Sequence, residues 1–333
     1  MLGIGIVGTS SIAHEFAKAL VMSKEYQIKS VYSRTLFKAE SFGNVYGAEL
    51  FFDNLEEFLS CKDFDVVYIA SPNSLHFSQT MAALHKGKHV IVEKPAFSNM
   101  VEWEEAFQLA EEKGLFLFEA ARHIHDSNFQ IIKNEVAKLE EIDSAILHFG
   151  KYSSRYDQVL AGEEPNIFSL RFSGGALMDL GVYLIYAAIS WFGEPESGEY
   201  FPKKVHTGVD GAGTIILHYP YYDAILHVSK ISNLFAQSEV HSGKKTLLMD
   251  GVSVISSIEL HDDASENVQL AVQPPEHLML DEARAFAEVI NHPESKENQE
   301  KYQSWKKLSH DVSYWIEKLR KQAGIFFDAD TEK

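Results

Sequence analysis

A lysine directly follows a short apolar run in the segment His89-Val90-Ile91-Val92-Glu93-Lys94-Pro95. The apolar run predicts a short strand that is covered on both faces, and Pro95 biases Lys94 toward an extended backbone. We therefore expect Lys94 to project from the carboxyl end of a strand, the edge at which open α/β sheets bind ligands. The pattern alone is equally typical of a solvent-exposed lysine at a strand end.

An aspartate and a tyrosine lie four residues apart in the apolar stretch 176–192. We expect this stretch to be a helix, in which the spacing places Asp179 and Tyr183 on one face. Polar side chains inside an apolar helix are costly unless they are paired. The two residues alone leave two interpretations open. Either Asp179 binds backbone donors beside a core tyrosine, or the two side chains line a substrate site.

The composition is that of an ordinary globular protein, since 45% of the 333 residues are hydrophobic and 23% are charged. The net charge of −18 argues against nucleic acid or an anionic membrane as a partner. A single cysteine, Cys61, excludes an internal disulfide and fits a reducing compartment. No secretory signal is visible and the histidines lack ligand spacing. We therefore expect a cytoplasmic protein without a metal site.

The first motif is a glycine turn between a predicted strand at residues 4–7 and a predicted helix that runs to about residue 22. Gly8 suits the tight turn and Ala13 allows close packing of helix on strand, as in a dinucleotide fingerprint. Ser10 replaces the middle glycine of that fingerprint, and its hydroxyl could bind a phosphate. The cofactor contacts predicted here are Gly8, Thr9, Ser10, Ser11 and Ile12.

Predicted strands and helices alternate from this turn to residue 118. Such alternation implies right-handed crossovers and a parallel sheet. We expect a doubly wound Rossmann domain over residues 1–121, followed by a second domain over residues 122–333.

The end of the second predicted strand indicates which dinucleotide binds. A carboxylate there would bind a ribose 2′-hydroxyl, and an arginine there accommodates a 2′-phosphate. The sequence has Ser33-Arg34-Thr35, with Lys38 one turn later and no carboxylate. We therefore predict NADP in preference to NAD, with Ser33 and Arg34 as contacts. The alternative is an Arg34 that stacks on adenine or lies in solvent.

The loop after the fourth predicted strand ends at the same sheet edge as Gly8 and Lys94. It reads Ser71-Pro72-Asn73-Ser74-Leu75-His76, and Asn73 or Ser74 could cap the next helix. We expect Ser71, Pro72, Asn73 and His76 to contact the cofactor, together with Glu93. A structural role for His76 is the alternative.

Taken together, these motifs resemble the Gfo/Idh/MocA family of glucose–fructose oxidoreductase and inositol dehydrogenase. The resemblance covers nearly the whole chain. Its motifs are residues 8–13, Ser33-Arg34, residues 69–76, Glu93-Lys94-Pro95, the Gly-Gly-Ala-Leu-Met-Asp run that ends at Asp179, and residues 281–286.

The resemblance implies an oxidoreductase that transfers a hydride between nicotinamide and a sugar, polyol or related hydroxy or carbonyl compound. It implies that Lys94 is catalytic, that Asp179 lines the substrate site, and that Tyr183 stands where many members carry a proton-transferring histidine. A phenol has an ordinary pKa of about 10, and a neighbouring ammonium lowers it. Lys94 beside Tyr183 would therefore form an acid–base pair.

The second half should complete an α+β domain with a large, mostly antiparallel sheet. Alternating, β-branched residues over 198–270 predict an antiparallel meander. We expect its uncovered face to form a homodimer or homotetramer, through the set Ile215, Leu217, Leu226 and Val228. His125 and Arg155 are predicted substrate contacts, with a capping role and a surface ion pair as their alternatives.

Two other functions fit the same family. One is a redox-silent protein that senses the dinucleotide and regulates a partner, and the other is a hydrolase that uses tightly held NAD. Retention of Lys94, Asp179 and Tyr183 favours the dehydrogenase or reductase, since a sensor does not need proton-transfer groups. The sequence does not identify the substrate or the preferred direction of the reaction.

Overall fold

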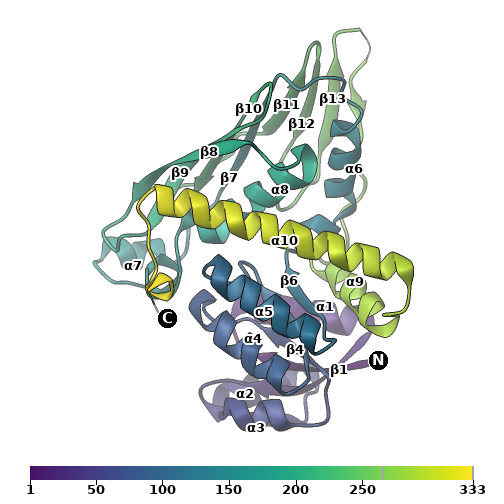
Figure 1. The fold of residues 1–333 in the computed structure, drawn as a ribbon, viewed down its shortest axis with the longest axis vertical. Coiled ribbons are helices and arrows are strands. Elements are labelled where there is room, and N and C mark those ends of the chain that lie inside the picture. The colour runs from purple at the N-terminus through teal and green to yellow at the C-terminus, as the bar shows by residue number, and fades with distance from the viewer. Residues whose placement is uncertain (265, 332–333) are drawn as a thin grey trace. The chain divides into compact units, whose positions relative to one another are not determined.

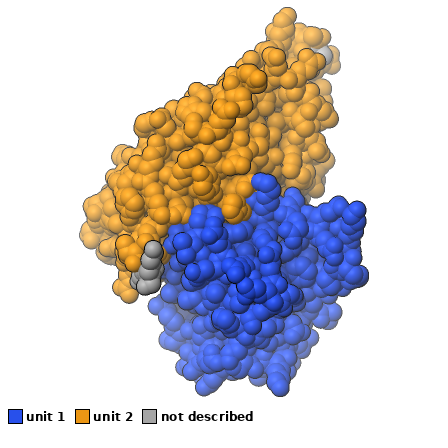
Figure 2. Space-filling view, in the orientation of Figure 1, with its two compact units in different colours: residues 1–122, 275–307 blue, residues 123–274, 308–333 orange. Residues whose placement is uncertain are grey.

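The computed structural model describes residues 1–264 and 266–331, and the chain forms two compact units (Figures 1 and 2). Unit 1 comprises Met1–Arg122 and Pro275–Lys307, and unit 2 comprises His123–Pro274 and Leu308–Lys333. Each unit is described by itself below.

Unit 1 is built on a six-stranded parallel sheet in the order β3-β2-β1-β4-β5-β6. This confirms the doubly wound sheet predicted from the alternation. Its strands are β1 (Leu2–Val7), β2 (Tyr26–Tyr32), β3 (Leu50–Phe52), β4 (Val66–Ile69), β5 (His89–Glu93) and β6 (Leu117–Ala120).

Helices cover the two faces of this sheet (Figure 1). They are α1 (Ser11–Ser23), α2 (Leu36–Tyr46), α3 (Leu55–Ser60), α4 (His76–His85), α5 (Met100–Glu112) and α9 (Leu280–Asn291). Strand β5 shows why its sequence is continuously apolar. Ile91 packs in the core cluster with α1, α2 and α9, whereas Val90 and Val92 pack in the other cluster with α3, α4 and α5. A strand buried on both faces has no position for a polar side chain.

The return of residues 275–307 to unit 1 differs from the single boundary that we expected after residue 121. Helix α9 explains the difference, because its apolar face completes one core cluster of unit 1. The Phe286 ring stacks on Phe118 at 4.5 Å, and the Tyr26 hydroxyl donates to the Ala283 carbonyl oxygen at 3.0 Å. Helix α10 (Lys296–Gln322) then carries the chain from unit 1 to unit 2.

Unit 2 contains an eight-stranded sheet in the order β14-β13-β12-β11-β7-β10-β9-β8. Its strands are β7 (Ser144–Gly150), β8 (Ser197–Lys204), β9 (Asp210–His218), β10 (Asp223–Ser229), β11 (Ser238–Ser242), β12 (Lys245–Met249), β13 (Ile258–Asp262) and β14 (Val268–Gln269). The predicted meander over 198–270 is interrupted, because β7 inserts between β10 and β11 and pairs with β10 in parallel. The sheet remains mostly antiparallel, as expected.

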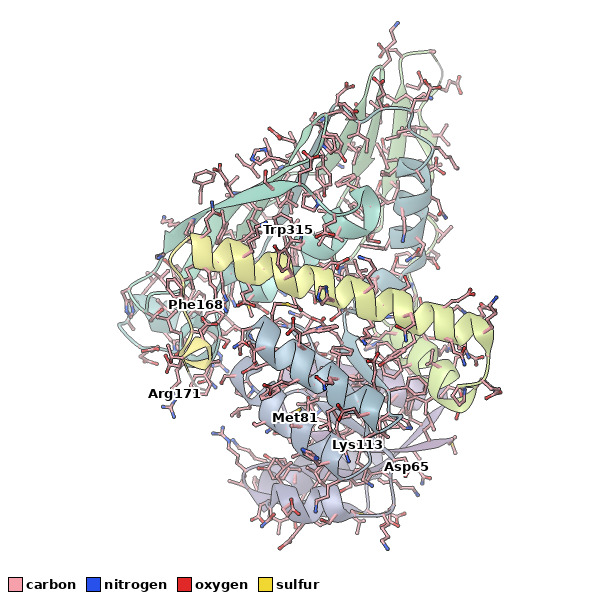
Figure 3. The ribbon with its side chains drawn as sticks, viewed as in Figure 1. Asp65, Met81, Lys113, Phe168, Arg171 and Trp315 are labelled. Carbon is pink, nitrogen blue, oxygen red and sulfur yellow. The ribbon has the colours of Figure 1, made fainter. Side chains whose placement is uncertain are left out.

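One face of this sheet is covered by helix α8 (Val182–Phe192) and the π-helical turn η4 (Leu177–Gly181), which contact β7 and β10. Helix α6 (Ser127–Val136) packs on α8, and the short helix α7 (Tyr156–Leu160) also belongs to unit 2. Short 3₁₀ turns are η1 (Asn73–Leu75) in unit 1, η2 (Arg122–His125) where the units join, and η3 (Asn166–Phe168) and η5 (Asp328–Asp330) in unit 2. Trp315 of α10 lies against Gly198 of β8 (Figure 3).

The covered face corrects one expectation about oligomerisation. Ile215, Leu217, Leu226 and Val228 are fully buried inside the chain, on the face toward η4 and α8. They are therefore unavailable to a second subunit. The opposite face carries a row of three paired isoleucines, Ile216, Ile225 and Ile146, of which Ile225 is 40% exposed.

In the part of the chain that the structure describes, no helix combines the length and the apolar composition that crossing a membrane requires.

A buried acid in α9 yields a stability prediction for unit 1. Glu282 is fully buried, and neither carboxylate oxygen has a hydrogen-bond partner among the described residues. Burial raises the pKa of Glu282 well above its ordinary value, the nearby Glu93 charge raises it further, and the Arg122 charge opposes both. The unfolded chain would ionise Glu282 near pH 4.3, about its ordinary pKa. Stability is therefore lost as pH rises from there toward the folded-state pKa.

We predict that Glu282→Gln raises the melting temperature at pH 8 by several degrees, for a gain of about 1–3 kcal/mol. The gain should vanish near pH 3, where the acid is almost fully protonated in both states. Scanning calorimetry at both pH values measures the effect, with the exposed Glu288→Gln on the same helix as control. A gain or loss of equal size at both pH values would contradict the prediction.

Candidate active site

The glycine turn of unit 1 is shaped for close approach of a ligand. Gly8 has a φ of 102°, and a Cβ at this position would lie 2.7 Å from the Ala70 carbonyl oxygen. Ser10 caps α1, because its side-chain oxygen accepts from the Ala13 amide at 3.4 Å. The hydroxyl hydrogen can still be donated to a ligand. The first amides of an α-helix lack intrahelical partners, so this turn fits the pyrophosphate of a dinucleotide.

The end of β2 carries cations and no carboxylate. The Ser33 amide donates to the Phe52 carbonyl oxygen at 3.1 Å, which fixes the loop against β3. Arg34 and Lys38 are exposed on either side of the start of α2. The chemistry of this loop therefore fits a phosphate group better than a ribose hydroxyl.

His76 connects the loops that follow β4 and β5. Its Nε2 lies 2.9 Å from the Ser71 carbonyl oxygen, and its Nδ1 lies 3.1 Å and 3.2 Å from the carbonyl oxygens of Pro95 and Ala96. The side chain is buried, and burial lowers the pKa of His76. These contacts give the imidazole a role in holding the two loops, which is the structural alternative for this residue.

Lys94 lies at the carboxyl end of β5, as predicted. Strands β1, β4 and β5 are neighbours, and their register pairs Val7 with Ile69 and Ile69 with Val92. The loops that begin at Gly8, Ser71 and Lys94 therefore leave the same edge of the sheet. The Lys94-Pro95 peptide bond is cis.

Two buried glutamates, Glu93 and Glu119, make hydrogen bonds close to Lys94. The buried Glu93 carboxylate accepts from the Tyr68 hydroxyl at 2.6 Å, and Glu119 accepts from the Ala96 amide at 3.0 Å. Burial raises the pKa of Glu93, while the Tyr68 hydrogen bond and the Lys94 charge lower it. Glu93 thus supports the site from inside the sheet.

In unit 2, Asp179 is paired with a lysine that the sequence interpretation did not identify. Lys230 Nζ lies 2.6 Å from Asp179 Oδ2. The Lys230 side chain is 2% exposed, whereas that of Asp179 is 28% exposed. Asp179 lies in the π-helical turn η4, a feature that is frequent at functional sites. The alternation in β10 could have indicated Lys230, because Leu226, Val228 and Lys230 follow a period of two on the buried face.

A second buried carboxylate explains the glycine pair before η4. Asp210 accepts from the Leu177 amide and from the Tyr200 hydroxyl, each at 2.6 Å. A Cβ at Gly175, whose φ is 121°, would lie 2.1 Å from Asp210 Oδ1. Gly175 therefore lets this carboxylate reach the start of the turn that carries Asp179.

Tyr183 lies in the first turn of the regular helix α8 and packs among aromatic rings of unit 2. Its ring centroid lies 4.7 Å from that of His123 and 5.4 Å from that of Phe149. Tyr183 is 7% exposed. Asp179 and Tyr183 therefore lie on one continuous helical segment, and η4 replaces the first turn of the helix predicted over 176–192.

The two predicted substrate contacts differ in environment. His125 lies in η2, and burial lowers its pKa to about 3, so its imidazole is neutral at pH 7. Arg155 is exposed at the N-terminus of the short helix α7.

Comparison with known proteins gives matches along the whole chain. Residues 2–121 match the family model described as "Oxidoreductase family, NAD-binding Rossmann fold". The scyllo-inositol 2-dehydrogenase (NADP(+)) IolU of Bacillus subtilis is 35% identical over 334 residues, covering 99% of both chains. The uncharacterized oxidoreductase YgjR of Escherichia coli is 33% identical over 340 residues, covering 100% of both.

A solved structure shows the same fold at lower sequence identity. The 3-ketoreductase KijD10 from Actinomadura kijaniata superposes with a TM-score of 0.83 and is 23% identical, covering 96% of this chain and 97% of its own. Together with the full-length relatives, the glycine turn and the Glu93-Lys94-Pro95 edge lead to one conclusion: the chain belongs to the Gfo/Idh/MocA family of oxidoreductases.

Proposed function

We propose that this protein is an NADP-dependent oxidoreductase that acts on a hydroxyl-bearing carbon of a polyol, sugar or related diol, with Lys94 and Tyr183 as its catalytic pair. One observation carries the proposal: Lys94 and the Gly8 turn leave the same edge of the parallel sheet. The 35% identical relative named scyllo-inositol 2-dehydrogenase (NADP(+)) supports both the cofactor and the substrate class.

The residues of unit 1 fit a bound dinucleotide. The Gly8 turn and the amides of Ser11 and Ile12 would hold the pyrophosphate, and Thr9 and Ser10 would donate hydroxyl hydrogens to it. Ser33 and Arg34 would hold the 2′-phosphate. Ser71, Pro72 and Asn73 would line the path toward nicotinamide, in a loop held by His76 and beside the sheet end supported by Glu93. When bound, the nicotinamide ring supplies or accepts the hydride.

Three side chains would transfer the proton, stabilise the charge on the reacting oxygen and orient the substrate. Tyr183 would transfer the proton of the substrate hydroxyl. The Lys94 ammonium would stabilise negative charge that develops on that oxygen. Asp179 would orient the substrate by accepting hydrogen bonds from its hydroxyl groups. The neutral His125 imidazole and the exposed Arg155 guanidinium would add further polar contacts.

We propose self-association through the face of the eight-stranded sheet that carries Ile146, Ile216 and Ile225. The three side chains are neighbours across β7, β10 and β9. Glutamates extend this row at each end, with Glu199 opposite Ile216 and Glu239 opposite Ile146. The apolar row would pack against the same row of a second copy in a homodimer, which could pair again into a homotetramer, with the glutamates at the edge of the contact.

Removing either catalytic group should abolish most turnover. We predict that Lys94→Met and Tyr183→Phe each lower kcat by at least about 100-fold on a polyol substrate, because each removes a charge-stabilising or proton-transferring group. NADPH affinity, measured by fluorescence titration, should change little in Tyr183→Phe. Lys113→Met, an exposed lysine in the turn after α5, is the control. Wild-type turnover in either variant would refute the catalytic pair.

Removing the positive charge at the end of β2 should weaken the binding of NADPH more than the binding of NADH. We predict that Arg34→Ala raises the Kd for NADPH by about 10- to 100-fold, the worth of a charge-assisted contact to phosphate. The Kd for NADH should change less than about threefold by the same scale. Fluorescence titration with both cofactors measures the effect, and the exposed Lys62→Ala is the control. Equal losses for NADPH and NADH would show that Arg34 does not bind the 2′-phosphate.

A charge in the isoleucine row should break the assembly. Light scattering on the wild-type protein at micromolar concentration should give a dimer or tetramer, and Ile225→Glu should shift it toward monomer, since facing copies would bury a carboxylate. Val254→Glu, at a residue of similar exposure outside the strands, is the control. A monomeric wild type, or an unchanged mass in Ile225→Glu, would contradict the assignment of this face.

A further inference from the structure

A buried ammonium lies directly beside the carboxylate that we assign to substrate binding. Lys230 immediately follows β10, and two hydrogen bonds of 2.8 Å fix its backbone. Its amide donates to the Gly211 carbonyl oxygen, and its carbonyl oxygen accepts from the Ser153 amide. Its Nζ lies 2.6 Å from Asp179 Oδ2 and 4.9 Å from the centre of the Phe168 ring, which is labelled in Figure 3. Unit 2 therefore holds this cation in one defined place.

A buried lysine is costly unless its partners compensate for the loss of water. Burial raises the pKa of Asp210 and the Lys230 charge opposes that rise, while the Asp210 carboxylate accepts hydrogen bonds from the Leu177 amide and the Tyr200 hydroxyl. Lys230 forms a direct ion pair with Asp179. The cation is nearly inaccessible, whereas its partner is 28% exposed. A ligand can therefore contact the Asp179 carboxylate more readily than the Lys230 ammonium behind it.

We propose that Lys230 is a positioning residue that keeps the Asp179 carboxylate ionised and aimed, so that Asp179 selects substrates with a hydroxyl group next to the reacting carbon. This inference rests on the proposed function, because it assigns a specificity role within the same site. An ionised carboxylate accepts hydrogen bonds and donates none. A substrate hydroxyl adds a hydrogen bond to the carboxylate beside Lys230. An analogue that lacks this hydroxyl displaces water from Asp179 without replacing its hydrogen bond, which is a strong basis for rejection.

The placement of Asp179 in a π-helical turn makes such a support necessary. The turn η4 is bounded by the Gly175 backbone and the Asp210 cap on one side and by the regular helix α8 on the other. Lys230 contacts this turn from a strand end, where the backbone is rigid. A contact from β10 to η4 fixes the direction of the Asp179 side chain independently of the helix that follows it.

The test is a double-mutant cycle of Lys230→Met, Asp179→Asn and the double variant. The substrates are the polyol that the wild type turns over best, from a panel of inositols and hexoses, and its deoxy analogue. We expect Lys230→Met to lower kcat/KM for the polyol by about 10- to 100-fold, mainly through KM, and to change the analogue by less than about threefold. The double variant should be no worse than Asp179→Asn alone.

A conservative variant of Lys230 and a control lysine distinguish a positioning role of Lys230 from a general structural role. Lys230→Arg keeps the charge and should retain more of the discrimination between polyol and analogue than Lys230→Met. Lys244→Met, in the exposed turn between β11 and β12, should match the wild type. NADPH affinity reports on unit 1 and should be unchanged in every variant.

Thermal melting gives a readout that does not depend on activity. Asp179→Asn removes the carboxylate of a buried ion pair, so its melting temperature should fall by several degrees. The added Lys230→Met change should recover part of that loss. If the wild type oxidises or reduces no polyol with either cofactor, the proposed function fails. If the wild type turns over but the two substitutions have multiplicative effects, or Lys230→Met leaves discrimination intact, only the role of Lys230 is refuted.

Discussion

Parallel pairing of β1, β4 and β5 is the constraint on which the rest of unit 1 depends. Parallel neighbours end at a common edge of the sheet. Because Val7 pairs with Ile69 and Ile69 pairs with Val92, the Gly8 turn and Lys94 both lie at that edge. The buried contacts beneath this edge then fix the loops. His76 joins the loops after β4 and β5, and Glu93 receives the Tyr68 hydroxyl.

Unit 2 differs from unit 1 in that it holds polar groups inside an apolar layer of helices and sheet. Asp179 pairs with the Lys230 ammonium, and Asp210 accepts hydrogen bonds from the Tyr200 hydroxyl and the Leu177 amide. Removing one member of such a network costs more than the network contributes to stability. The network is therefore better explained by the substrate-binding role that we propose for Asp179 than by a contribution to stability.

The sequence predicted the parallel sheet well because alternating strands and helices are local signals. Val90, Ile91 and Val92 carry the signal of a strand buried on both faces, and Gly8 carries that of a tight turn. Long-range pairing was harder to predict. The insertion of β7 between β10 and β11, and the return of α9 to unit 1, depend on contacts between residues more than seventy positions apart. Lys230 was missed because a lysine after a strand is ordinarily exposed, although the period-two pattern placed it inward.

The central claim is that Lys94 and Tyr183 act on one substrate oxygen. A crystal structure of the protein with NADP and a polyol substrate tests it most directly. The account predicts that Lys94 Nζ and Tyr183 Oη both lie within about 3.2 Å of the same substrate hydroxyl oxygen. A bound polyol whose reacting hydroxyl contacts neither side chain, or contacts only one of them, would contradict the account.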